Sequence, residues 1–138
     1  MTLTQTLQPP GLWDPAEHLF AQGVLVAAAP RTLYLAGQTA IDGQGQIVGA
    51  GDPAAQIECC FNNMDILLRA AGGRLADVVR LRAYFTDMRY LDLYTEILGR
   101  YLPDQRPSQT VVQVAALAMP ELLVELEATA VLDAKEVA

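Results

Sequence analysis

Apolar and polar residues alternate along residues 78–86 and again along residues 122–132. Successive side chains of a strand point to opposite faces of its sheet, so each stretch predicts a strand with one buried face. In the first stretch the predicted core face consists of Val79, Leu81, Ala83 and Phe85. In the second stretch the polar face consists of Glu125, Glu127 and Thr129. Charges inside a strand indicate a wet surface, a subunit interface or a functional site.

Shorter patterns predict further strands. Residues 31–38 and 110–114 are apolar enough for strands, and the glycine-rich turn within residues 41–48 predicts a hairpin. Residues 1–19 contain several prolines and are predicted to form turns.

Two longer segments carry apolar residues at the three- and four-residue spacing of an amphipathic helix. The first helix is predicted to begin at Asp52-Pro53, because aspartate is a good N-cap and proline suits the first helical position. It is predicted to end near Ala71, before the glycine pair at 72–73. The second helix is predicted over residues 90–102. This order of strands and helices favours an α+β fold, with both helices on one face of the sheet and other copies of the chain against the opposite face.

The composition indicates one acidic domain. The chain has 138 residues, which predicts a single domain over residues 1–138, and its formal net charge is −7. Nucleic acid and anionic membrane surfaces are disfavoured as partners because they would repel this charge. No apolar run approaches the roughly 20 residues of a membrane helix, and residues 1–5 lack the features of a signal peptide. We therefore expect a cytoplasmic protein.

Candidate metal ligands are few. The two cysteines, Cys59 and Cys60, are adjacent and would point about 100° apart in a helix. Together with His18, the only histidine, they do not supply the ligand spacing of a zinc site. We expect the cysteines to be small helix residues with buried side chains. His18 is either an acid or base near neutral pH or a loop histidine.

Seven short motifs occur in an order and spacing that resemble the Rid/YjgF family of reactive intermediate deaminases, over residues 18–132. The motifs are Phe20-Ala21-Gln22-Gly23, Leu35-Ala36-Gly37-Gln38, Ala70-Ala71-Gly72, Asp77-Val78-Val79-Arg80, Phe85-Thr86-Asp87-Met88, Arg106-Pro107 and Val124-Glu125-Leu126-Glu127-Ala128. The resemblance implies a chorismate-mutase-like α+β fold, with a mixed six-stranded sheet and two helices on one face. It also implies a homotrimer that binds a small-molecule substrate in a cleft between each pair of subunits.

The resemblance also implies an activity. Deaminating members of the family hydrolyse enamines and imines, such as 2-aminoacrylate and 2-iminobutanoate, to 2-keto acids and ammonia, without a metal or a cofactor. Carried over by motif, Glu125 positions or activates water and Gly37 belongs to the turn whose backbone N–H groups meet the substrate. The alternative for Glu125 is a structural carboxylate paired with Arg80 or Arg82. The alternative for Gly37 is a turn that requires glycine for its backbone conformation alone. Glu127 is expected to form a structural ion pair.

Three positions depart from the family pattern. Phe20 stands where the family has a tyrosine. Val111 stands where the family often has a cysteine, although the substrate contact at this position is usually made by the backbone. Gln109 stands where the family has the arginine that clamps the substrate carboxylate. Trp13 and Phe20 form either an apolar lid or ordinary N-terminal packing.

The neutral Gln109 changes the expected substrate. A charge-assisted hydrogen bond contributes about 1.5–3 kcal/mol, against about 1 kcal/mol for a neutral one, so losing the arginine weakens carboxylate binding by roughly one to two powers of ten. An amide, ester or ring carbonyl matches Gln109 better, unless Gln109 is a spare loop residue of a degraded site. The predicted function is hydrolytic deamination of a reactive enamine or imine; the alternative is a non-catalytic trimer that binds a small metabolite. RNA cleavage is disfavoured by the acidic charge and the absence of a histidine pair.

Overall fold

The computed structural model describes residues 4–18, 21–28, 30–104 and 106–133. The strands within these ranges are β1 (Thr4–Leu7), β2 (Gly23–Val26), β3 (Arg31–Leu35), β4 (Gln38–Thr39), β5 (Val78–Phe85), β6 (Ser108–Gln113) and β7 (Val124–Leu132). The α-helices are α1 (Pro53–Ala70) and α2 (Leu91–Tyr101), and short 3-10 helices span Ala16–His18, Leu75–Asp77 and Met88–Tyr90.

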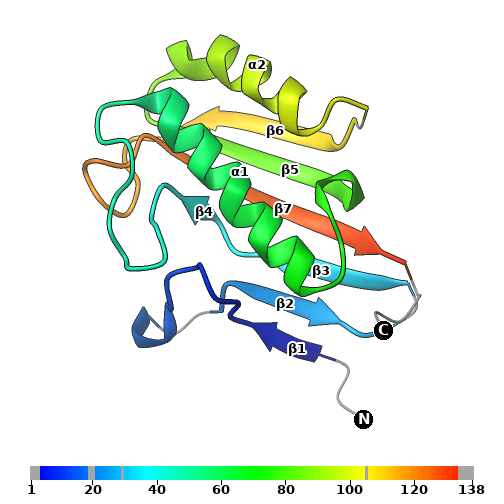
Figure 1. Ribbon diagram of the computed structural model, residues 1–138. Coiled ribbons are helices and arrows are strands. Elements are labelled where there is room, and N and C mark those ends of the chain that lie inside the picture. Colours follow the sequence, from blue (N-terminus) through cyan, green and yellow to red (C-terminus); the bar gives the residue numbers. More distant parts are fainter. Residues whose placement is uncertain (1–3, 19–20, 29, 105, 134–138) are drawn as a thin grey trace.

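The strands form one mixed sheet in the order β1-β2-β3-β7-β5-β6. All neighbouring strands are antiparallel except β5 and β6, which are parallel. The expected six-stranded path is therefore present, and the two-residue strand β4 adds a further pairing to β7. Figure 1 shows both helices on the same side of this sheet, with α1 crossing its centre and α2 near the β6 edge. The α+β prediction with helices on one face is confirmed.

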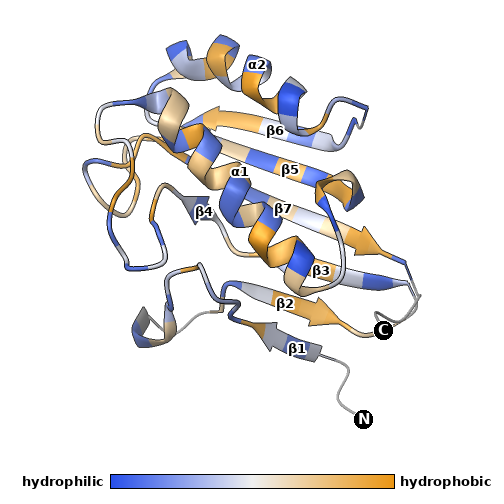
Figure 2. Ribbon diagram, in the orientation of Figure 1, coloured by the Kyte–Doolittle hydropathy of each residue, from blue (hydrophilic) through white to orange (hydrophobic). Residues whose placement is uncertain are grey.

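Helix α1 forms where its sequence predicts it. The Asp52 carboxylate accepts a hydrogen bond from the Ala55 backbone N–H at 3.1 Å, which caps the first turn. At the other end Gly72 has φ +81°, and the Gly73 N–H donates to the Leu68 carbonyl at 2.8 Å. The face toward the sheet is buried, and it consists of Ile57, Cys60, Phe61, Met64, Leu67 and Leu68. Figure 2 shows the corresponding mixture of apolar and polar positions along both helices.

The prediction that Val79 lies on the core face of β5 is wrong. Its side chain is 46% exposed, whereas Val78 is buried. The register of β5 against β7 shifts between Val78 and Arg80, which is an irregularity of the β-bulge kind. An extra residue at a bulge is left out of the alternation, so the strand changes face at this point. Residues 81, 83 and 85 are buried as predicted.

The predicted hairpin over residues 41–48 forms a turn without two regular strands. A single bridge joins Ile41 and Ile47. The Asp42 side chain accepts hydrogen bonds from the backbone N–H groups of Gln44 and Gln46, both at 2.9 Å. These side-chain bonds compete with a regular ladder for the same donors.

The N-terminal turn prediction missed β1, which pairs with β2 from Thr4 to Leu7. No periodic pattern marks this strand, since three of its four residues are exposed.

The helix-free face of the sheet is partly apolar. Tyr34, Val112 and Val131 are 53%, 39% and 38% exposed, and strand pairing places them on the same face as Glu125 and Glu127. Within the described ranges, no helix has both the length and the hydropathy needed to cross a membrane.

Candidate functional site

Glu125 lies in β7, and its carboxylate packs against Gly37, the second of the two residues between β3 and β4. In the sheet Glu125 is opposite Tyr84 on one side and Thr39 on the other. A Cβ atom placed on Gly37 would lie 2.8 Å from Cδ of Glu125 and closer still to Oε2, well inside contact distance. Gly37 is not among the residues with positive φ. Space for the carboxylate, rather than a left-handed backbone, is therefore what requires glycine here.

The environment of Glu125 disfavours its charged form. Burial raises the pKa of the Glu125 carboxyl above its ordinary value, and the negative charge of Glu127 raises it further. In the described part of the chain no ion pair involves Glu125. A carboxylate with a raised pKa is a better proton acceptor at neutral pH than an ordinary one.

Glu127, two residues along the same face, has different partners. Nη1 of Arg82 lies 3.6 Å from Oε2 of Glu127. The hydroxyl of Tyr84 donates a hydrogen bond to Oε1 of Glu127 at 3.0 Å. The predicted ion pair of Glu127 is thus present, and Arg82 is paired with Glu127 rather than with Glu125.

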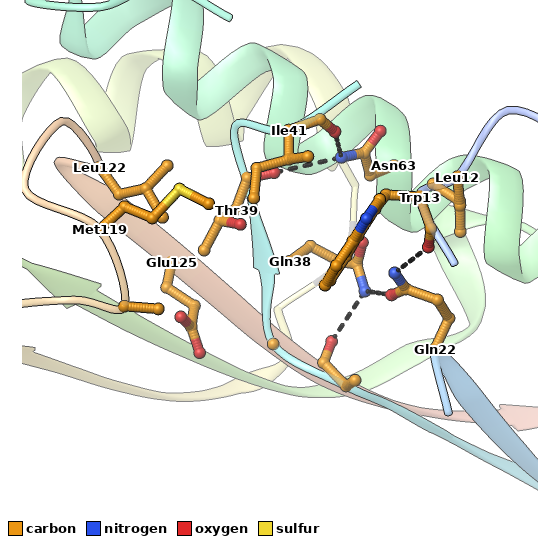
Figure 3. A pocket seen from close by; sticks show the side chains of 13 residues that line it. Leu12, Trp13, Gln22, Gln38, Thr39, Ile41, Asn63, Met119, Leu122 and Glu125 are labelled. Atoms are coloured by element: carbon orange, nitrogen blue, oxygen red, sulfur yellow. Dashed lines mark hydrogen bonds between the residues drawn. The ribbon is translucent and has the colours of Figure 1, made fainter. Parts of the chain in front are cut away.

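Glu125 opens into a pocket of about 560 Å³. Three apolar segments line it: the N-terminal segment, the loop after β4, and the segment that leads into β7. The lining residues are Leu12, Trp13, Gln22, Ala36, Gly37, Gln38, Thr39, Ile41, Asn63, Ala118, Met119, Leu122 and Glu125. Figure 3 shows Met119, Leu122 and Glu125 on one side of the pocket and Trp13 with Gln22 on the other.

A pair of buried glutamines forms part of the pocket wall. Nε2 of Gln38 donates hydrogen bonds to Oε1 of Gln22 at 2.7 Å and to the Ala36 carbonyl at 3.1 Å. Nε2 of Gln22 in turn donates to the Trp13 carbonyl at 2.8 Å (Figure 3). Gln22 and Gln38 are both buried. This chain of bonds fixes the N-terminal segment against the turn that contains Gly37.

Asn63 of α1 ties the helix to the loop after β4. Its Nδ2 donates to the carbonyls of Thr39 at 3.2 Å and Ile41 at 3.0 Å. The pocket wall is therefore held by side-chain hydrogen bonds from two directions.

Gln109 lies elsewhere in the subunit. It belongs to edge strand β6 and lines a second pocket of about 360 Å³, together with residues of α2 and of the 102–107 loop. The Tyr94 hydroxyl donates a short hydrogen bond of 2.5 Å to Oε1 of Gln109. Val111 of the same strand is half-buried and packs against the core. A single subunit does not bring Gln109 or Val111 together with Glu125.

Two other predicted positions are not placed. Phe20 lies outside the described residues, and so does the side chain of His18, whose backbone ends the 3-10 helix Ala16–His18. Trp13, considered as a lid together with Phe20, does line the pocket. Among the described residues, no group of three or more His, Cys, Asp or Glu side chains is arranged to hold a metal ion.

Sequence reasoning missed Gln22 and Asn63 as pocket residues, and it placed Gln38 there only through the backbone of its turn. Gln22 and Gln38 stand inside two of the family motifs, which was the available signal. Nothing in the local pattern distinguishes Asn63 from any polar residue on a helix.

Comparison with known proteins identifies the family. A family model described as endoribonuclease L-PSP matches residues 14–132. Human 2-iminobutanoate/2-iminopropanoate deaminase is 32% identical over 127 residues, which cover 91% of this chain and 86% of that protein. The 3-aminoacrylate deaminase RutC of Acinetobacter baylyi is 29% identical, over 84% of this chain and 98% of that protein. The crystal structure of RidA from an Antarctic Psychrobacter species superposes with a TM-score of 0.80 at 29% identity, over 93% of this chain and 99% of that one. The chain belongs to the Rid/YjgF family.

Proposed function

We propose that this protein is a hydrolytic deaminase of a reactive enamine or imine, and that Glu125 orients and activates the attacking water. The single observation that carries the proposal is the position of Glu125: a half-buried carboxylate with a raised pKa, held over Gly37 at a pocket and without an ion pair among the described residues. The deaminase names of the two curated relatives support the reaction class. The net charge of −7 disfavours the RNA substrate that the description of the family model suggests.

The reaction needs only water and a proton acceptor. Water adds to the carbon of the protonated C=N bond, and Glu125 takes a proton from the water as the C–O bond forms. The resulting carbinolamine receives this proton on nitrogen. Its C–N bond then breaks while the hydroxyl proton passes to Glu125, which leaves a carbonyl and ammonia, and the ammonia takes up the proton as ammonium. Gly37 is proposed to offer its backbone N–H to the substrate beside this carboxylate.

We further propose a homotrimer in which the substrate lies at a subunit interface. The exposed apolar residues Tyr34, Val112 and Val131 on the helix-free face support contact between copies. Gln109 is exposed on the edge strand β6, so a neighbouring subunit is proposed to bring it to the pocket of Glu125. Because Oε1 of Gln109 accepts from Tyr94, its NH₂ group is the part left to face the substrate.

Competition with a chemical trap tests the activity. An amino-acid oxidase generates 2-iminobutanoate in the presence of semicarbazide, and an active deaminase lowers the yield of semicarbazone. We expect the native protein to compete with the trap weakly, Gln109→Arg to compete more strongly, and Glu125→Gln not to compete. Asp92→Asn is the matched control, since it removes one charge from an exposed position of α2.

Unchanged turnover in Glu125→Gln would refute the role of this carboxylate. Ligand binding in the pocket without turnover of any imine would instead favour a metabolite-binding trimer.

A further inference from the structure

The pocket beside Glu125 is larger and more apolar than a small imino acid requires. Its volume of about 560 Å³ lies within the roughly 300–1,000 Å³ typical of pockets for drug-sized ligands. The side chain of 2-iminobutanoate is a short alkyl group. The remaining space is bounded mainly by the apolar side chains Leu12, Trp13, Ile41, Met119 and Leu122.

The apolar wall around Trp13 is built in advance of any ligand. A Cβ atom on Gly45 would lie 3.0 Å from Cδ1 of Trp13, so the indole packs directly on the turn at Gly45. The Trp13 carbonyl is held by Gln22 at 2.8 Å and by Gln8 at 3.1 Å. Pockets that are already formed lose little entropy when they bind.

Three of the polar side chains that line the pocket, those of Gln38, Asn63 and Glu125, offer hydrogen-bond acceptors to a ligand. Both N–H groups of the Gln38 amide donate to Gln22 and Ala36, which leaves the amide oxygen as its available group. The amide nitrogen of Asn63 likewise donates to the carbonyls of residues 39 and 41, which leaves its oxygen available. Glu125 in its ionised form is also only an acceptor. A matching ligand therefore carries N–H donors.

The charge of the pocket also favours a cationic ligand over an anionic one. No arginine or lysine is among the described lining residues of one subunit, and Glu125 contributes the only formal charge there. Gln109, which a neighbouring subunit is proposed to bring to the pocket, is neutral. A substrate carboxylate in this pocket would meet repulsion without a cationic partner, whereas a protonated imine would be attracted.

From this lining, and building on the deaminase function proposed above, we propose a substrate class for the pocket. The substrate is a protonated imine derived from an amine, with an aryl or branched alkyl body and no carboxylate. Its body lies among Trp13, Ile41 and Met119, and its N–H groups donate to Glu125 and Gln38.

This substrate class indicates which kinds of reaction supply the substrate and consume the product. A two-electron oxidation of a primary amine, R–CH₂–NH₂, by a separate amine oxidase supplies the imine R–CH=NH. Hydrolysis of the protonated imine by water yields the aldehyde R–CHO and ammonium, with no change of redox state. An enzyme that oxidises or reduces aldehydes would consume the product.

Binding is tested with stable probes. Trp13 is the only tryptophan, so its fluorescence reports entry into the pocket. We expect phenethylamine, which is cationic and apolar, to saturate the signal at a concentration at least tenfold lower than phenylacetate, which has a similar body and the opposite charge. Equal or tighter binding of phenylacetate would overturn the proposed substrate class.

A variant that carries a positive charge in the pocket tests where the two probes bind. Met119→Arg should weaken phenethylamine and strengthen phenylacetate, each by about tenfold. Leu91→Arg is the matched control, because Leu91 on α2 is equally exposed at 37% and lies outside the pocket lining; it should change neither affinity. If both variants behave alike, the probes are not bound beside Met119 and the proposal fails.

Turnover separates this inference from the proposed function. A flavin amine oxidase generates the phenethylamine-derived imine, an amino-acid oxidase generates 2-iminobutanoate, and semicarbazide traps either one. We expect the first imine to be hydrolysed at least tenfold more efficiently. Preference for 2-iminobutanoate would overturn the substrate class and support the deaminase function. Hydrolysis of neither, with phenethylamine still bound in the pocket, would refute the deaminase function and support the ligand class.

Discussion

The carboxylate of Glu125 occupies the space where a side chain on Gly37 would begin. A Cβ atom at position 37 would lie 2.8 Å from Cδ of Glu125 and nearer still to Oε2, which is too close for non-bonded atoms. Because the group in the way is the end of a flexible side chain, a substitution at position 37 would displace Glu125 before it disturbed the backbone. The glycine thereby controls where the proposed catalytic group lies.

Gly37→Ala should reduce kcat/KM by about 100-fold, since a displacement of about 1 Å at a reacting group costs this much. The free energy of unfolding should change by less than about 1 kcal/mol, because alanine at a position without positive φ is easily accommodated. Activity is measured by the trapping assay and stability by urea unfolding.

Gly99→Ala is its control. Gly99 lies within α2 with open space around it, so alanine there should stabilise the protein by about 0.5–1 kcal/mol and leave kcat/KM unchanged. Full activity in Gly37→Ala would show that the position of the Glu125 carboxylate does not matter.

Glu125→Gln should stabilise the protein at neutral pH. Burial raises the pKa of folded Glu125 above its ordinary value of 4.5, so the native state holds this proton more tightly than the unfolded chain. As pH rises from 4.5 through the raised pKa, the unfolded chain loses the proton first and the native state loses stability. Glutamine does not ionise, so the advantage of the variant should shrink as pH falls toward 4.5 and below. Urea midpoints across pH 4–8 measure this, and a variant with no such trend would contradict the raised pKa.

The pH dependence of kcat/KM should follow the titration of the Glu125 carboxyl. Water activation needs the ionised carboxylate, so kcat/KM should fall with decreasing pH along a limb centred above 4.5. Glu127→Gln removes a like charge and should move this limb to lower pH, while burial keeps it above the ordinary value. A limb that does not move would show that Glu127 has no influence on the titration of the catalytic group.

Tyr94→Phe should loosen Gln109 without unfolding the core. The Tyr94 ring lies against Phe61 and Phe85, with centroids 6.3 Å and 5.2 Å away, and phenylalanine keeps this packing. Loss of the hydroxyl removes one hydrogen bond, worth about 1 kcal/mol. We expect KM to rise about 3- to 10-fold with kcat nearly unchanged.

Tyr101→Phe is the control for this change, because the Tyr101 hydroxyl bonds to exposed Asn62 at 3.2 Å and its ring also packs on Phe61. An equal rise of KM in both variants would argue against a positioning role for Tyr94.

The mass in solution should be about 45 kDa, three times the chain mass of 14.9 kDa. Val131→Glu places a charge on the helix-free face and should yield monomers with little activity, since each site is proposed to use two subunits. Leu91→Glu, on the helical side, should remain trimeric. Light scattering measures the masses. A native monomer with full activity would contradict the shared site.

Local signals in the sequence determined the helices, the faces of β7 and the faces of β5 from Leu81 onward. The N-cap at Asp52, the apolar stripe of α1 and Gly72 act within a few residues of one another, so their effect can be read without the fold. The alternation along β7 places Glu125 opposite the core in the same way.

Only the tertiary structure decided the features that depend on distant segments. The bulge that exposes Val79 exists only against β7, and β1 exists only against β2. The bond between Gln22 and Gln38 depends on the pairing of β2 with β3. The packing of Glu125 on Gly37 depends on the pairing of β3 and β4 with β7. Periodicity and capping report the preferences of a single segment, whereas a buried amide or a carboxylate takes its partners, and its pKa, from whichever segments the fold places beside it.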